Sequence, residues 1–195
     1  MVAGDYISDP KAVQQVIERA PEGICRLVSW GVHFDKKADG EFDLHREGGH
    51  SEFRILHHAD DTGYEIQRGL IEAVRRSPNI TVMDHHFAVE IITQHHLGVD
   101  VTRRTPNIEC YGAYVYNPET KRIDTLLSRV TVIATGGVGA VYASTTNPNI
   151  ATGDGIAMAY RAKATVKDME FVQFHPTALY HPKETHPAFL ITEAM

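Results

Sequence analysis

The chain has 195 residues, of which 43% are hydrophobic and 23% are charged, and its formal net charge is -6. These values are typical of a globular protein and exclude an intrinsically disordered one. With 19 basic against 25 acidic residues and no block of lysine or arginine, the sequence predicts no nucleic-acid partner. No apolar run reaches the roughly 18–20 residues that cross a bilayer, and no signal-peptide pattern opens the chain. We therefore expect a soluble, cytoplasmic protein without a membrane partner.

The spacing of the cysteines and histidines argues against a disulfide framework and against a dedicated metal centre. There are two cysteines, Cys25 and Cys110, and neither has a CxxC partner. Twelve histidines occur, among them the adjacent pairs His57-His58, His85-His86 and His95-His96. Adjacent residues on a strand point to opposite faces, so such a pair does not chelate a cation by itself. We expect surface or strand histidines and no metal site.

The first elements in chain order are two helices. Asp9 followed by Pro10 is typical of an N-cap and first helical position, and the spacing of apolar residues predicts a helix as far as Ala20. A second helix is predicted from Pro21 to about Trp30, where Gly31 ends it. A polar stretch follows, with a candidate strand at 42–44 and a glycine pair at 48–49.

A helix and several strands are predicted next. Thr62 and Glu65 form a capping-box pattern, and the apolar spacing that follows predicts a helix to about Ser77. Strand-like runs follow at 80–83, 88–93 and 111–116, which together predict one strand and a β-meander. Residues 129–135 (RVTVIAT) predict a buried strand that leads directly into Gly136 and Gly137. Ligands bind outside the carboxyl ends of strands in open α/β sheets.

The last predicted helix opens at Thr152-Gly-Asp-Gly155, with Asp154 in its first turn. A carboxylate there is stabilised by the helix dipole, so Asp154 has either a capping role or a ligand-binding one. The predicted core face of this helix consists of Ile156, Ala157, Tyr160 and Ala164. From Val172 onwards the composition changes, and a new domain is expected to begin. No nucleophile elbow, Walker loop or intact GxGxxG is present.

Several motifs in register resemble the succinate dehydrogenase/fumarate reductase flavoprotein family. They are ATGGVGAVY at 134–142, TTNP at 145–148, TGDG at 152–155, MEFVQFHPTALY at 169–180 and LITE at 190–193. The resemblance implies an α/β fold, with part of a Rossmann-like FAD-binding domain and a β-meander insertion over 1–168. It also implies the start of an α+β capping domain at 169–195. We expect an internal part of a longer protein, because the family's N-terminal GxGxxG strand and its catalytic arginine, expected beyond the C-terminus, are not present.

Within this family, HREGGHS at 45–51 resembles the branch that oxidises aspartate. The resemblance implies that Glu47 faces the substrate's amino group and that His175, Thr192 and Glu193 bind the distal carboxylate. Electrostatics supports this role of Glu47, because aspartate carries an ammonium group that a buried carboxylate can pair with, whereas succinate has none. Without the resemblance, Glu47 would be interpreted as a solvated loop acid and His175 as a structural histidine.

The resemblance also implies non-covalently bound FAD, with Asp154, Thr135, Gly136, Gly137 and Val89 near the cofactor. The implied reaction converts L-aspartate to iminoaspartate, with oxygen or fumarate as acceptor and quinolinate synthase as the pathway partner. Two alternatives stay open. The first is a fumarate reductase or succinate dehydrogenase flavoprotein, and the second is that the 195-residue chain alone is catalytically silent.

Overall fold

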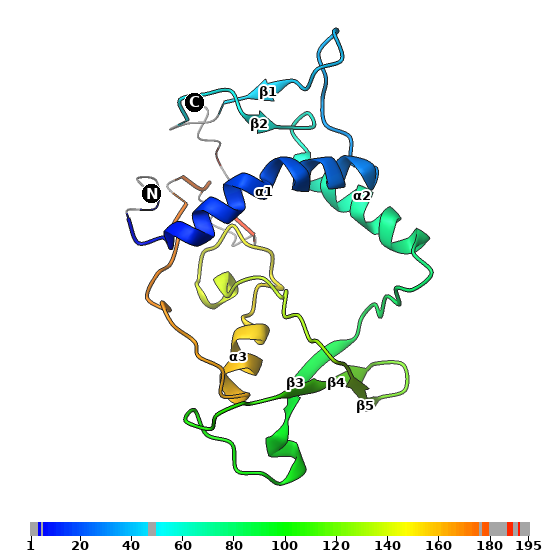
Figure 1. Cartoon of the computed structure of the whole chain (residues 1–195), viewed down its shortest axis with the longest axis vertical. Helices are drawn as coiled ribbons and strands as arrows, with labels where there is room; N and C mark the ends of the chain where they lie inside the picture. Colours follow the sequence, from blue (N-terminus) through cyan, green and yellow to red (C-terminus); the bar gives the residue numbers. More distant parts are fainter. Residues whose placement is uncertain are drawn as a thin grey trace. The chain divides into compact units, whose positions relative to one another are not determined.

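A computed structural model describes residues 4, 6–46, 50–175, 177–179, 187–188 and 191. The chain divides into two compact units, the first over Met1–Val82 and the second over Met83–Glu193. Figure 1 shows the elements of both units, coloured along the sequence. Of the helices in the described ranges, none is both long and apolar enough to cross a membrane.

Unit 1 begins with one long helix, α1, over Pro10–Ser29. Asp9 caps it, because its Oδ1 accepts hydrogen bonds from the backbone N–H groups of Lys11 and Ala12. The predicted break before Pro21 is wrong, since Pro21 lies inside the continuous helix. A proline removes one backbone hydrogen bond, and here the turns on either side keep the helix intact.

A short antiparallel ribbon follows α1. Strand β1 (Leu44–His45) pairs with β2 (Ile55–Leu56), with Leu44 opposite Leu56. An isolated bridge between Lys36 and Phe42 precedes it. The predicted strand at 42–44 therefore lies slightly later in the chain than expected.

The second helix of unit 1, α2, spans Thr62–Arg76 and confirms the predicted helix. The predicted capping box is wrong: Thr62 Oγ1 accepts from the backbone N–H of His58, and Glu65 accepts from that of His33. Thr62 therefore binds the loop directly before the helix, and Glu65 binds the segment after α1, so neither side chain caps the first turn of α2. Gly69 lies against Val32, which is 1% exposed, so this part of α2 packs closely on the segment after α1.

Unit 2 contains a three-stranded antiparallel sheet in the order β3-β4-β5. The strands are β3 (Phe87–Thr93), β4 (Cys110–Asn117) and β5 (Arg122–Leu127). The predicted meander is confirmed, but its third strand is β5. Residues 80–83 form no strand with any described segment. Short 3₁₀ turns, η2 (Gln94–Leu97) and η3 (Gly139–Val141), complete the elements before the last helix.

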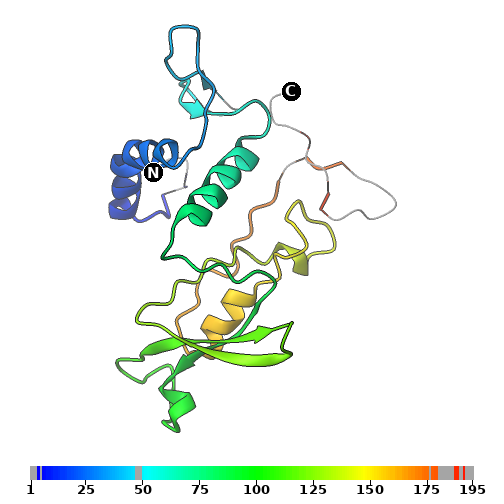
Figure 2. The ribbon, with the colours of Figure 1, turned by 90° about the vertical axis from the view of Figure 1, so that its right-hand side faces the viewer.

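Helix α3 (Asp154–Arg161) lies beside β3, as the views in Figures 1 and 2 both show. Its buried residues are Gly155 and Met158. The predicted core face is therefore wrong: Ile156 is half-buried and Ala157, Tyr160 and Ala164 are exposed. Tyr160 is 55% exposed and lies under the guanidinium of Arg103. A cation over the ring face stabilises a tyrosine that the helix does not bury.

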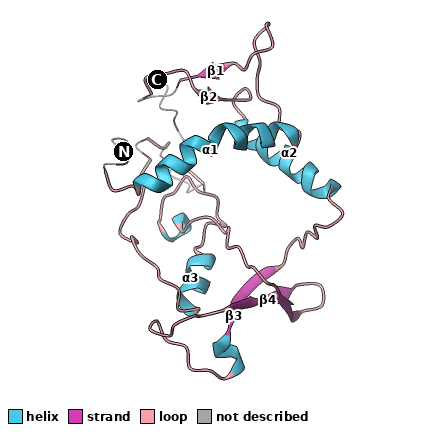
Figure 3. Cartoon of the chain, viewed as in Figure 1, coloured by secondary structure: helices cyan, strands magenta, loops and turns pink. Residues whose placement is uncertain are grey.

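The predicted buried strand at 129–135 is not formed among the described residues. This segment is extended loop in Figure 3, with Val130 77% and Val132 81% exposed. The antiparallel pairing ends just before it, where the Ser128 N–H donates to the Tyr111 carbonyl. A strand needs a neighbouring backbone to pair with, and no described segment provides one here.

Candidate functional site at the start of helix α3

The loop after residue 135 lies against the start of α3. The N–H of Gly153 donates to the carbonyl of Gly137 at 3.1 Å, and the N–H of Ala140 donates to that of Ala151 at 2.9 Å. Gly153 is the N-cap residue of α3 and has a φ of +78°, a left-handed conformation that favours glycine. These contacts hold the glycine pair next to the first turn of the helix.

Gly155 brings Thr135 to the same place. A Cβ at position 155 would overlap Thr135 Oγ1 and lie 2.6 Å from Ile133 Cγ2. Only glycine therefore allows this close approach between the helix and the extended segment. The structure thus gathers four of the residues expected at the cofactor: Thr135, Gly136, Gly137 and Asp154.

The surroundings of this glycine pair fit a cofactor that approaches the backbone. Gly136, with a φ of +71°, and Gly137 are exposed, and the space where each would carry a Cβ is open. The first turn of a helix presents N–H groups without helical partners, which suit a phosphate. Asp154 is half-buried in that turn. Backbone donors, open space and a half-buried carboxylate are a combination suited to a dinucleotide.

Val89, the fifth expected cofactor residue, lies at the opposite end of α3. Its carbonyl accepts from Arg161 Nη2 at 2.9 Å, while Arg161 Nε contacts Glu90 Oε2 at 2.7 Å. Because α3 has eight residues, about 12 Å of helix separates Asp154 from this contact. The structure therefore does not bring Val89 together with the other four residues.

A mostly apolar cavity of about 330 Å³ lies beside this end of the helix, within the size range of small-molecule sites. It is lined by Ile91, Thr93, Ile108, Glu109, Cys110, Thr131, Ile133, Ala159, Ala162 and Ala164.

Among the expected substrate residues, His175 is the one within the described ranges. It is partly exposed, and its Nδ1 lies 3.1 Å from the carbonyl oxygen of Thr177. That same carbonyl accepts from the N–H of Ile191, the residue directly before Thr192 in the chain. Glu47, Thr192 and Glu193 lie outside the described residues.

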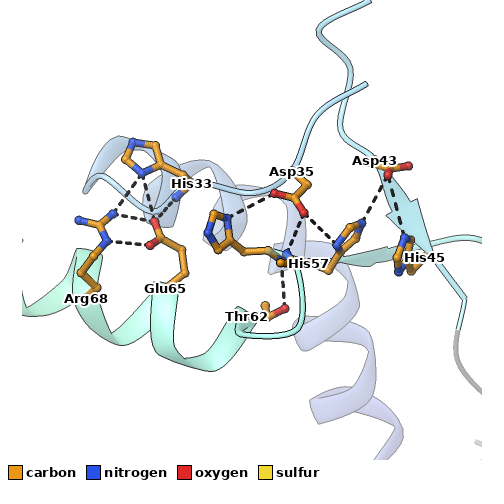
Figure 4. Close-up of polar contacts among 10 residues, drawn as sticks. His33, Asp35, Asp43, His45, His57, Thr62, Glu65 and Arg68 are labelled. Atoms are coloured by element: carbon orange, nitrogen blue, oxygen red, sulfur yellow. Dashed lines mark hydrogen bonds and ion pairs between the residues drawn. The ribbon is translucent and has the colours of Figure 1, made fainter. Parts of the chain in front are cut away.

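Sequence reasoning missed a charged network in unit 1, shown in Figure 4. Glu65 is 5% exposed, and its two oxygens accept from Arg68 Nε and Nη2 at 2.7 and 2.6 Å. These bonds, with the backbone N–H of His33, lower the pKa of Glu65 from 4.5 to about 2. Hydrogen bonds to Glu65 and to Glu72 raise the pKa of Arg68. The i, i+3 spacing of Glu65 and Arg68 was a usable signal for the pair, but nothing local predicted its contact with the His33 segment.

The chain belongs to the FAD binding domain family, whose model matches residues 1–195. It is 49% identical over 201 residues to L-aspartate oxidase 2-b, chloroplastic, from Nicotiana tabacum and 43% identical over 200 residues to L-aspartate oxidase from Vibrio cholerae. The alignments cover 100% of this chain, and 30% and 36% of those proteins. The chain thus spans about a third of the length of these relatives.

The fold resembles that of a flavoprotein of known structure. The FrdA chain of E. coli quinol fumarate reductase matches with a TM-score of 0.81 and 30% sequence identity. The match covers 97% of this chain and 29% of that chain. The mixed helix and sheet arrangement is therefore an FAD-binding fold of the fumarate reductase flavoprotein type, and FAD is the cofactor of its family.

Proposed function

We propose that this chain is part of an L-aspartate oxidase, which oxidises L-aspartate to iminoaspartate for NAD synthesis. The observation that supports this proposal is 43–49% identity over the whole chain to plant and bacterial L-aspartate oxidases, against 30% to a fumarate reductase flavoprotein. When bound, FAD supplies the two-electron redox chemistry, with oxygen or fumarate as the final acceptor. Quinolinate synthase is the proposed pathway partner, and the cytoplasm the proposed location.

The proposed architecture is a Rossmann-like FAD-binding domain with a meander insertion over 1–168, and the start of a capping domain over 169–195. Within it, the exposed backbone of Thr135, Gly136 and Gly137 would lie along the non-covalently bound cofactor, and the first turn of α3 with Asp154 would face its polar part. Val89 would lie near the adenine. The apolar cavity beside β3 and α3 supports a second contact region at that end of the helix.

In the proposed substrate site, the residues neutralise and orient a dicarboxylate. Glu47 would accept hydrogen bonds from the aspartate ammonium, while His175 and Thr192 would donate to the distal carboxylate. Glu193 would orient one of these donors rather than contact the anion. The carbonyl of Thr177, which lies 3.1 Å from His175 Nδ1, also accepts from the N–H of Ile191.

The alternative is a fumarate reductase or succinate dehydrogenase flavoprotein, which the similarity to FrdA favours. The two functions differ in their need for a carboxylate at position 47. In the complete protein, Glu47→Gln should lower kcat/KM for aspartate much more than for fumarate reduction, since fumarate has no ammonium to pair with Glu47. Equal losses on both substrates would contradict the proposed role.

For the 195-residue chain alone, we propose that it is catalytically silent. The test is a visible absorption spectrum after incubation with FAD and gel filtration. A retained and perturbed flavin band, together with aspartate-dependent bleaching, would contradict the proposed silence. A retained band that aspartate does not bleach would agree with cofactor binding without turnover.

A further inference from the structure

Three metal-ligating side chains in and next to the β1–β2 ribbon of unit 1 lie together: Asp43 directly before β1, His45 in β1 and His57 directly after β2. One ligand atom from each lies within 4.8 Å of the other two. Asp43 Oδ2 is 3.7 Å from His57 Nε2 and 4.0 Å from His45 Nε2. Figure 4 shows both imidazoles directed at this carboxylate.

The register of the ribbon explains this arrangement. Asp43 and His45 are two positions apart on an extended segment, so their side chains share one face. Leu44 pairs with Leu56, and extending that antiparallel register by one residue places His57 opposite Asp43. The rings of His45 and His57 stack with their centroids 3.6 Å apart. The backbone therefore places three potential metal ligands on one face of the ribbon, and the adjacent His58 is not one of them.

The polar atoms of His57 are buried without adequate hydrogen bonds. Its side chain is 12% exposed, and among the described residues neither Nδ1 nor Nε2 has a partner with hydrogen-bond geometry. The nearest acceptors are carboxylate oxygens of Asp35 and Asp43, at 3.3 and 3.7 Å. A buried polar atom that lacks a partner costs free energy. A cation bound to Nε2 of His57 would supply the missing partner.

Asp35 provides the outer contact that metal-binding histidines usually have. Its Oδ2 lies 3.3 Å from His57 Nδ1 and accepts from the backbone N–H of Ala59 at 2.8 Å. The backbone holds Asp35 as well, because its N–H donates to the carbonyl of His57. A carboxylate beside Nδ1 favours the tautomer that leaves the Nε2 lone pair available to a metal.

We propose that Asp43, His45 and His57 bind a divalent cation of the zinc class, with Asp35 orienting His57. Two imidazoles and one carboxylate favour zinc-like cations over calcium or magnesium, which prefer oxygen ligands. Tetrahedral zinc with ligands at about 2.0–2.2 Å holds the ligand atoms about 3.3–3.6 Å apart. The distances of 3.7 and 4.0 Å from Asp43 Oδ2 to His57 Nε2 and His45 Nε2 therefore need to shorten by a few tenths of an ångström, and the His45 ring needs to turn. The His45 side chain is 58% exposed and free to make that turn.

The test is a titration of the tag-free 195-residue chain, stripped with a chelator, with Zn²⁺ by calorimetry. Co²⁺ serves as a spectroscopic probe, because its visible absorption reports the ligand geometry. We expect one tight Zn²⁺ per chain and at least tenfold weaker binding in His45→Gln and in Asp43→Asn. His95→Gln, which removes an exposed histidine of unit 2, is the matched control and should bind Zn²⁺ as the unchanged chain does.

A further variant tests the positioning role of Asp35. Asp35→Asn should weaken Zn²⁺ binding by about 10–100-fold, as loss of an outer carboxylate usually does. Circular dichroism of each variant shows whether it is folded, and the exposure of His45 makes His45→Gln the variant that least disturbs the fold. Equal Zn²⁺ affinity in the unchanged chain and His45→Gln, or no Zn²⁺ binding by the unchanged chain, would overturn the proposal.

Discussion

At the scale of single residues, the buried charge of Glu65 makes the stability of the fold depend on pH. Its pKa is about 2 in the folded chain against 4.5 ordinarily, first because of the hydrogen bonds from Arg68 and then because of that from His33. The folded state therefore binds this proton more weakly than the unfolded state does. The resulting stabilisation is present above about pH 4.5 and is lost as the pH falls from there to about 2.

Glu65→Gln should remove that pH dependence. Between pH 5 and pH 2, we expect the urea midpoint of unit 1 to fall less steeply in this variant than in the unchanged chain. Trp30, the single tryptophan, lies in unit 1 and reports its unfolding by fluorescence. Glu18→Gln, which changes an exposed glutamate of α1, should keep the original slope. The same slope in both variants would mean that the Glu65 network does not control acid stability.

The close packing around Gly155 predicts that a larger residue there would disturb the candidate cofactor site. In Gly155→Ala the new methyl group would lie 2.6 Å from Ile133 Cγ2 and overlap Thr135 Oγ1, so α3 and the 133–135 segment must separate. Overpacking of this kind costs about 1–3 kcal/mol. Hydrogen exchange of the α3 amides should accelerate accordingly. Gly23→Ala, in an open position of α1, should instead stabilise its helix by about 0.5–1 kcal/mol.

At the scale of elements, Gly112 controls the pairing of β4 with β5. Its φ is +139°, and a Cβ there would lie 2.9 Å from the Leu126 carbonyl carbon and from Leu127 Cα. In the pairing of β4 with β3, the register shifts next to Gly112, because Ile92 pairs with Gly112 whereas Thr93 pairs with Cys110. Tyr111 is therefore an extra residue, as in a β-bulge, and the glycine permits the distortion.

Gly112→Ala should destabilise unit 2 by roughly 2–4 kcal/mol, since steric overlap with backbone adds to the strain of a positive φ. Hydrogen exchange of the β4 and β5 amides measures this effect. Gly98→Ala separates the two causes, because Gly98 also has a positive φ but has open space around it. We expect a loss of about 1–2 kcal/mol there. Equal losses in the two variants would mean that strain alone explains the effect of Gly112.

The elements that could be predicted from sequence are those with a strong local pattern. Helix α2 and strands β3 and β4 follow from apolar periodicity, and the cap of α1 follows from Asp9. The long-range contacts could not be predicted in this way. Glu65 was expected to cap its own helix, yet it binds His33, which is 32 positions away.

The candidate sites show the same division. The glycines around α3 are visible as a pattern in the sequence, and their conformations fit the expected backbone approach. The expected absence of a metal site rested on adjacent histidines, which point to opposite faces of a strand. The proposed site instead joins His45 with His57, across a strand register that the sequence does not reveal.

At the scale of the whole molecule, the chain exposes an unusually large surface. Its accessible area is 15,707 Å² for 21.7 kDa. Two separate compact bodies of half that mass each would expose about 11,000 Å². The exposed surface of the chain is therefore larger than that of two compact bodies, and it includes large apolar side chains such as Val130, Val132 and Ile150. Because exposed apolar side chains of this kind promote association, we expect the 195-residue chain to self-associate.

The extended segment 129–135 is the part of this surface best suited to pairing with another chain. Its backbone lacks a strand partner among the described residues, and Val132 is 81% exposed. Val132→Lys should therefore reduce self-association, because a lysine on an open edge discourages strand pairing. Sedimentation velocity over a range of protein concentrations measures this effect. Ile150→Lys adds the same charge at an equally exposed site, 82%, outside that segment. If both variants reduce association equally, general charge or apolar area is responsible. A reduction confined to Val132→Lys would identify the unpaired edge as the surface through which copies of this chain meet.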